Sequence, residues 1–159
     1  MNNVLSRLDL GAGYATSALR IGVGVLLAWH GYRKFADGLD GLEGFLSFLD
    51  LPAPGFLAVV VALLELVGGI LLALGLFTRP VAALFVIHFG LIFVWVKLIK
   101  LDPVFLVGGE QPGVELDLIY LLTSAFFLIG GPGQIAVDRV LGLETSTERS
   151  SAAREPVMA

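Results

Sequence analysis

The sequence predicts an all-α membrane protein, a four-transmembrane-helix bundle with antiparallel up-down connections. Of the 159 residues, 57% are hydrophobic and only 15% are charged, whereas soluble domains average roughly 45–50% apolar and about 25% charged residues. The apolar residues also gather in blocks near the roughly 20 residues that cross a hydrocarbon core of about 30 Å. A soluble fold could not bury this apolar excess, so composition and pattern agree on a membrane protein.

The first predicted span, residues 14–35, follows an N-terminal segment, 1–13, that lacks the apolar stretch and cleavage site of a signal peptide. We therefore expect this span to stay in the protein as an anchor, with Trp29 at a membrane–water boundary. After the span, apolar residues recur at three- and four-residue spacings before Pro52. This pattern predicts a short interfacial helix in the first loop.

The second and third predicted spans, 55–76 and 80–100, are separated by only three residues. So short a link forces an antiparallel hairpin, with Pro80 at or near the first turn of the third helix. The next loop, 101–113, contains two acidic residues and three glycines. We interpret it as a lid or a re-entrant turn.

The fourth predicted span, 114–130, is the shortest, and it ends at a Gly-Gly-Pro-Gly sequence that is a strong helix stop. The transmembrane domain therefore covers residues 14–141. The tail, 142–159, is rich in Ser, Thr, Ala and Glu and has no apolar period, which predicts disorder.

Charge favours an orientation with both termini in the cytoplasm. Four spans place the two ends of the domain on one side of the bilayer, and basic residues near the span ends favour the cytoplasmic side. Five lie on the side of the termini and four on the other: Arg7, Arg79, Arg139, Arg149 and Arg154, against Arg33, Lys34, Lys97 and Lys100. Because the basic residues are scattered and the net charge is −4, the sequence excludes a nucleic-acid-binding function.

The absence of cysteine rules out disulfides, iron–sulfur clusters and thiol redox chemistry on this chain. Any redox role therefore needs a bound cofactor or a partner. His30 and His88 could in principle ligate a haem from facing helices, but their different predicted depths argue against it. No His-Glu-x-x-His sequence or similar pairing is present, so we expect no metal site.

Four of the ionisable residues inside the predicted spans are the main candidates for function: Arg20, His30, Glu65 and His88. Each costs several kcal/mol or more in lipid, so each marks a candidate functional site that faces the bundle interior. A rise of about 1.5 Å per residue places Glu65 and His88 near the midplane, and Arg20 and His30 roughly 7 Å from it on opposite sides.

Helical periodicity predicts that the first two spans meet through polar and glycine-rich faces. At about 100° per residue, one face of the first helix carries Arg20, Gly24, His30, Gly31 and Lys34. One face of the second helix carries Glu65, Gly68 and Gly69. Glycines allow close helix packing, so we expect these faces to meet, with Glu65 pairing with Arg20 or His30.

The fourth span adds Glu115 and Asp117 on the side of the membrane where His30 and Lys34 end. Asp117, Tyr120 and Ser124 fall on one stripe that could continue a polar path inward. The alternative is structural. The acids would then favour a helix N-terminus, Arg20 and Glu65 would hold helices together, and each histidine would bond a neighbouring helix.

Several short sequences, taken in order, resemble the DoxX family of small four-helix membrane proteins. They run from about Ser17 to Leu141: Leu19-Arg20-Ile21, Trp29-His30-Gly31-Tyr32-Arg33-Lys34, Glu65 with Gly68-Gly69, Gly75-Leu76-Phe77-Thr78-Arg79, Glu115, Gly130-Gly131-Pro132-Gly133 and Asp138-Arg139. The family is named after a membrane subunit associated with a quinol oxidase and with thiosulfate:quinone oxidoreductase. The resemblance implies a multi-pass protein of the inner membrane of a bacterial or archaeal cell.

Together these observations predict a membrane subunit of a quinone-linked respiratory or redox-stress system, which binds a quinone or docks a redox-enzyme partner. The candidate cofactor-binding residues are Arg20, His30, Lys34, Glu65, His88 and Glu115. His30 would donate to a quinone carbonyl, and Glu65 would accept the proton or orient the donor. Two alternatives stay open: a non-catalytic scaffold or assembly subunit, and a small proton-coupled transporter or channel. Glycines on several faces also permit a homodimer.

Overall fold

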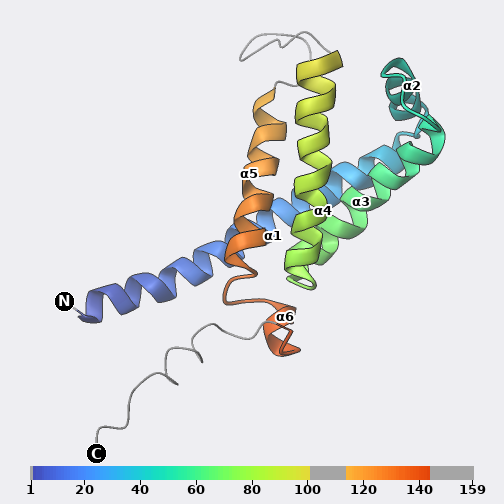
Figure 1. The fold of residues 1–159 in the computed structure, drawn as a ribbon. Coiled ribbons are helices and arrows are strands. Elements are labelled where there is room, and N and C mark those ends of the chain that lie inside the picture. Colours follow the sequence, from blue (N-terminus) through green and yellow to red (C-terminus); the bar gives the residue numbers. More distant parts are fainter. Residues whose placement is uncertain (1, 101–113, 144–159) are drawn as a thin grey trace, which may run out of the picture.

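The computed structural model describes residues 2–100 and 114–143, with side chains for 11–96 and 115–143, and this part of the chain is helical apart from short connections. The elements are α1 (Asn2–Ala36), α2 (Asp40–Phe48), α3 (Pro54–Leu74), α4 (Thr78–Leu91), a π-helical continuation η1 (Ile92–Lys100), α5 (Val114–Gly130) and α6 (Val137–Val140) (Figure 1). The predicted all-α class is confirmed.

Three described helices are long and apolar enough to cross a membrane: Gly11–Ala36, Pro54–Leu74 and Thr78–Val96. They correspond to the first three predicted spans, although α1 also continues through most of the N-terminal segment 1–13. Helix α5 has the bounds predicted for the fourth span, but its crossing of the membrane stays a prediction, as does the interfacial position of α2. The predicted lid, 101–113, and most of the predicted disordered tail lie outside the described residues.

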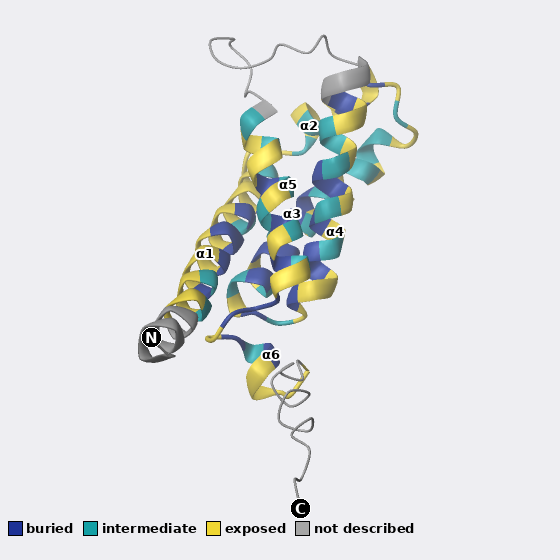
Figure 2. Cartoon of the chain, turned by 60° about the vertical axis from the view of Figure 1, so that its left-hand side comes forward, coloured by how far each residue is buried: buried dark blue, intermediate teal, exposed yellow. Residues whose placement is uncertain are grey.

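The four long helices form two antiparallel pairs that cross each other (Figure 1). Helix α1 packs along α3, and α4 packs along α5. Buried residues lie on the inner faces and exposed residues on the outer faces (Figure 2). The core between the pairs is built from Val23, Leu27, Leu72, Val81, Ala82, Phe85, Phe89, Tyr120 and Phe127.

Glycine makes the contact between α1 and α3 a direct contact of two backbones. A Cβ at Gly31 would overlap the backbone of Leu66 and Ala62, and a Cβ at Gly24 would overlap that of Ala73. Gly69 lies equally close to α1. The prediction that these glycines serve helix packing is confirmed, and they fix the register in which Gly31 lies beside Leu66.

The link between α3 and α4 turns within three residues. Gly75 has φ +70° and donates to the Leu72 carbonyl oxygen, while Leu76 donates to that of Leu71, which is a Schellman ending for α3. Phe77 also has positive φ, at +52°, a conformation that is uncommon for a residue with a bulky side chain. Its amide donates a hydrogen bond to the carboxylate of Asp138.

Candidate functional site

Arg20 lies completely buried at the end of the bundle where α3 and α5 finish. Its Nε donates to the Pro132 carbonyl oxygen at 2.8 Å, and its Nη1 donates to that of Ala73 at 2.7 Å. The same guanidinium also donates to the carbonyl oxygens of Leu72 and Ile135. We call this arrangement the Arg20 clamp. It satisfies carbonyls at the C-terminal end of α3, where helix geometry leaves them unpaired and partly negative.

Asp138 caps the start of α4, as Arg20 caps the end of α3. Its two carboxylate oxygens accept from the amides of Phe77 at 2.7 Å and Thr78 at 2.8 Å. A negative charge is favourable at a helix N-terminus, and these bonds hold the left-handed Phe77. The Asp138 amide in turn donates to the Gly75 carbonyl oxygen. The segment after α5 therefore closes two helix ends that belong to the second and third spans.

The predicted pairing of Glu65 with Arg20 is wrong. Along α3, the clamp carbonyl of Leu72 is seven residues from Glu65, which is roughly 10 Å at about 1.5 Å per residue. The guanidinium of Arg20 donates to backbone carbonyl oxygens instead, because carbonyls at the end of a buried helix have no water to accept hydrogen bonds from. The predicted site residues therefore separate into the clamp and a second cluster.

The second cluster surrounds Glu65, next to the centre of α3, and joins three helices. Glu65 is buried, and its Oε2 accepts from the ammonium of Lys34 on α1. Its Oε1 lies 3.4 Å from Nε2 of the buried His88 on α4. We call Lys34, Glu65 and His88 the Glu65 site. The prediction that Glu65 and His88 lie at one level is confirmed.

The Nε2 atom of His88 is buried and makes no hydrogen bond with the described part of the chain. It is near enough to Glu65 for an ion pair, but its orientation does not give a hydrogen bond. A buried polar atom that lacks a partner costs roughly 1–3 kcal/mol. Such an atom beside a carboxylate is therefore a candidate contact for a ligand oxygen.

Aromatic rings cover the Glu65 site on the side of α4 and α5. The Phe89 ring lies 4.9 Å from that of His88 and stacks on Tyr120 at 5.1 Å. Tyr120 in turn meets the edge of the exposed His30 ring at 6.3 Å and 84°. The predicted stripe of Tyr120 and Ser124 does face inward, since both are buried.

His30 lies at a different level from the one predicted. Because Gly31 contacts the backbone of Leu66, His30 is level with Glu65 rather than roughly 7 Å from the midplane. The bounds of an apolar block do not set the position of one helix along another, whereas the glycine contacts do. The depth argument against haem therefore fails, although the ring contacts place Tyr120 and Phe89 between the two imidazoles.

Glu115 is half-buried in the first turn of α5. Among the described residues it makes no ion pair or hydrogen bond with the Glu65 site. Its predicted role as a ligand contact therefore stays a prediction, and its position agrees equally with an acid that favours a helix N-terminus.

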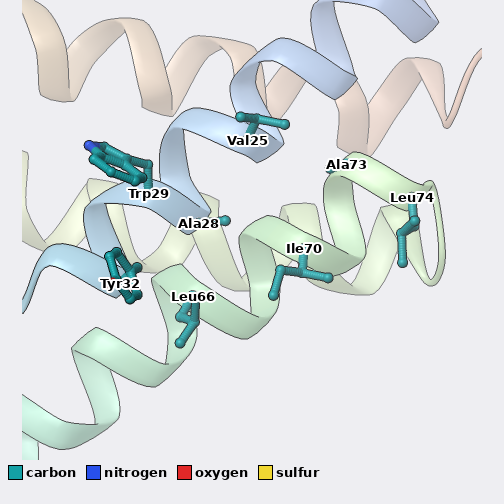
Figure 3. Close-up of a pocket in the computed structure, with 8 residues that line it drawn as sticks. All are labelled: Val25, Ala28, Trp29, Tyr32, Leu66, Ile70, Ala73 and Leu74. Carbon is teal, nitrogen blue, oxygen red and sulfur yellow. The ribbon is translucent and has the colours of Figure 1, made fainter. Parts of the chain in front are cut away.

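An open groove of about 510 Å³ lies on the opposite face of the α1–α3 pair. It is lined by Val25, Ala28, Trp29 and Tyr32 from α1 and by Leu66, Ile70, Ala73 and Leu74 from α3 (Figure 3). The glycine contact separates this apolar groove from the Glu65 site. It therefore supplies no part of the polar cluster.

Sequence reasoning missed two parts of these arrangements. Asp138 was noticed only within a family motif, and nothing in its local sequence indicates that it bonds to residues 77 and 78. Phe89 was passed over because an aromatic residue in an apolar span carries no signal of its own. The available clue was the spacing of Phe85 and Phe89, which puts both rings on the same face of the helix as His88.

Comparison with known proteins gives consistent matches over most of the chain. The profile of the family described as DoxX matches residues 15–98. A Bacillus subtilis protein named "Putative oxidoreductase CatD" is 34% identical over 124 residues, which cover 77% of this chain and 84% of that protein. No solved structure gives a significant match.

Two further relatives carry membrane names. The Escherichia coli "Inner membrane protein YphA" is 34% identical over 88 residues, 54% of this chain and 62% of that protein. The Mycobacterium tuberculosis "Uncharacterized membrane protein Rv3486" is 32% identical over 128 residues, 77% of this chain and 78% of that protein.

Proposed function

The chain belongs to the DoxX family of membrane proteins, and on that premise we propose that it is the membrane subunit of a quinone-linked redox system. In this proposal the quinone headgroup binds at the Glu65 site. The observation that carries it is the buried Nε2 of His88, which has no hydrogen-bond partner among the described residues and lies 3.4 Å from a buried carboxylate. The printed name of the Bacillus subtilis relative agrees with a redox role.

The chemistry of the site suits this ligand. A quinone carbonyl accepts hydrogen bonds, and His88 and the Lys34 ammonium are donors on either side of Glu65. Reduction of a quinone to a quinol takes up two electrons and two protons. Glu65 and His88 would pass the protons, and a partner oxidoreductase would supply the electrons, since the chain has no cysteine for a thiol or iron–sulfur carrier.

The proposed setting is the inner membrane, with α5 as a fourth span and both termini in the cytoplasm. Three candidate spans and the name of the Escherichia coli relative support a membrane location. The end of α5 lies near Gly13 of α1, because the Gln134 amide donates to the Gly13 carbonyl oxygen. This proximity supports a single side for the two ends of the domain.

The test is the equilibrium binding of a short-tailed benzoquinone to the purified protein in detergent, measured by the quenching of tryptophan fluorescence. We expect Lys34→Gln and Glu65→Gln each to weaken binding at least tenfold. Arg33→Gln is the matched control, because Arg33 is the neighbouring cation and pairs with Asp37 at the surface. Saturable binding that all three variants keep would remove the Glu65 site from the proposal. No binding by the wild type, together with a protein partner that co-purifies intact, would favour the scaffold alternative.

A further inference from the structure

A series of ring contacts leads from the outer surface of α1 to the buried carboxylate of Glu65. It begins at His30, which is exposed, and continues to Tyr120 and Phe89, which are buried. The three ring-to-ring distances along it are 6.3, 5.1 and 4.9 Å, and the last ring is that of His88. These rings form the wall between the surface and the Glu65 site.

The wall lies in the seam where α1 and α5 meet. On the other side of α1, the glycines bring its backbone directly against that of α3, which leaves no passage. Helix α4 packs closely along α5, whereas α1 touches α5 at only a few positions. Figure 1 shows α1 crossing α5 rather than running along it. The contact between α1 and α5 is therefore sparser than the contacts within the α1–α3 and α4–α5 pairs.

His30 is unusual for a residue on this face. It lies within the candidate span Gly11–Ala36, is level with Glu65, and has no hydrogen bond or ion pair with a described residue. An imidazole that faces lipid at this depth is costly. A ligand with hydrogen-bonding oxygens would partner it when it reaches the seam.

We propose that the quinone enters the Glu65 site sideways from the bilayer, between α1 and α5, by displacing the His30 ring from Tyr120 and then parting the stacked rings of Tyr120 and Phe89. This inference rests on the proposed function and adds a route and a gate to it. The planar quinone ring can stack on an aromatic face in place of the ring that it displaces. Tyr120 and Phe89, which stack on each other, offer such faces along the way to the site. The apolar tail stays outside in lipid, so the groove of Figure 3 is not its channel.

Association kinetics test the route. Stopped-flow quenching of tryptophan fluorescence by the short-tailed benzoquinone gives the association rate constant. We expect His30→Trp to lower it at least tenfold because the larger ring closes the seam, and His30→Ala to raise it several-fold. Val25→Trp is the control: it adds the same ring on the groove face of α1 and should leave the rate unchanged.

A photoreactive azidoquinone of the same tail length gives a second readout. Label should appear on peptides that contain His30 and Tyr120, and excess unlabelled quinone should remove it. Unchanged rates in both His30 variants, with label elsewhere, would overturn the sideways route while binding itself survives. Absence of any saturable binding to the wild type would instead overturn the proposed function.

Discussion

Glu65 on α3 contacts one side chain on α1 and one on α4, Lys34 and His88. The loss of stability when its carboxylate is removed therefore depends on whether the Lys34 charge stays behind without a partner. The carboxylate is buried and holds the Lys34 ammonium, whose side chain is 26% exposed. Loss of one member of a fully buried pair costs about 3–5 kcal/mol, whereas loss of both is often close to neutral. Because Lys34 is partly exposed, we expect the cost for this pair to lie at or just below the lower end of that range.

We therefore expect Glu65→Ala to lower the free energy of unfolding by about 2–3 kcal/mol. The double variant Lys34→Met with Glu65→Ala should recover part of that loss, because no uncompensated charge remains. The measurement is unfolding in mixed micelles with increasing SDS, read by circular dichroism. Strictly additive effects of the two substitutions would show that the ion pair does not hold α1 to α3.

Arg20 is a separate case, because its partners are four backbone carbonyls rather than a carboxylate. Lysine keeps the charge but loses the planar fork of donors. With hydrogen bonds of charged groups worth about 1.5–3 kcal/mol each, Arg20→Lys should destabilise the protein by about 3 kcal/mol or more. Thermal melting in detergent measures this, with Arg139→Lys at an exposed position as control.

The same variant also tests the separation of the two clusters. Protein with Arg20→Lys that remains folded should bind the benzoquinone as the wild type does, because the clamp lies roughly 10 Å along α3 from Glu65. A tenfold loss of affinity in folded protein would contradict that separation and restore Arg20 as a ligand residue.

At the level of elements, the contact between α1 and α3 depends on residues without side chains. Gly31→Leu would place a side chain where the α3 backbone now lies, so the helices must separate and Lys34 must move away from Glu65. We expect a fall in Tm of roughly 6–12 °C, from about 3 kcal/mol of overpacking at roughly 2–4 °C per kcal/mol for this size, with weaker quinone binding. Gly22→Leu is the control, since a Cβ at Gly22 has open space around it. Equal melting of the two variants would contradict the close packing.

The helices themselves were largely predictable from the sequence, and their contacts only in part. Long apolar blocks and the Gly-Gly-Pro-Gly stop gave α3 and α5 to within a few residues. The predicted meeting of the polar faces of α1 and α3 is confirmed, but the partner of Glu65 is Lys34 rather than Arg20 or His30. Periodicity predicts the direction in which a side chain points around a helix, but not the position of one helix along another. The register came from glycine contacts, which is why Arg20 and His30 were misplaced relative to Glu65.

The contacts of the segment after α5 could not be predicted from the sequence, for a different reason. Residues 131–138 have no period, and their bonds to Arg20, Phe77 and Thr78 join positions about 60 to 115 apart in the chain. Local patterns carry no information on contacts at that separation. The unpartnered Nε2 of His88 likewise depends on the orientation of a single ring.

For the whole molecule, the decisive question is on which side of the membrane each end of the bundle lies. The chain has no cysteine, so single cysteines can be introduced at exposed positions without a background signal. In spheroplasts, a membrane-impermeant maleimide should label Ser47→Cys in α2 and leave Gln134→Cys unlabelled until the cells are lysed. Labelling of both sites before lysis would contradict α5 as a fourth span, and the reverse pattern would place the termini outside.

The Arg20 clamp also constrains how the protein is made. Arg20 leaves the ribosome early, yet two of its acceptors, Pro132 and Ile135, are translated more than a hundred residues later. Until then, the nascent chain holds a guanidinium in an apolar helix with an incomplete set of partners, so this helix is at its least stable in the bilayer during synthesis. A ribosome that stops before residue 132 therefore leaves Arg20 in the first helix without two of its four carbonyl acceptors.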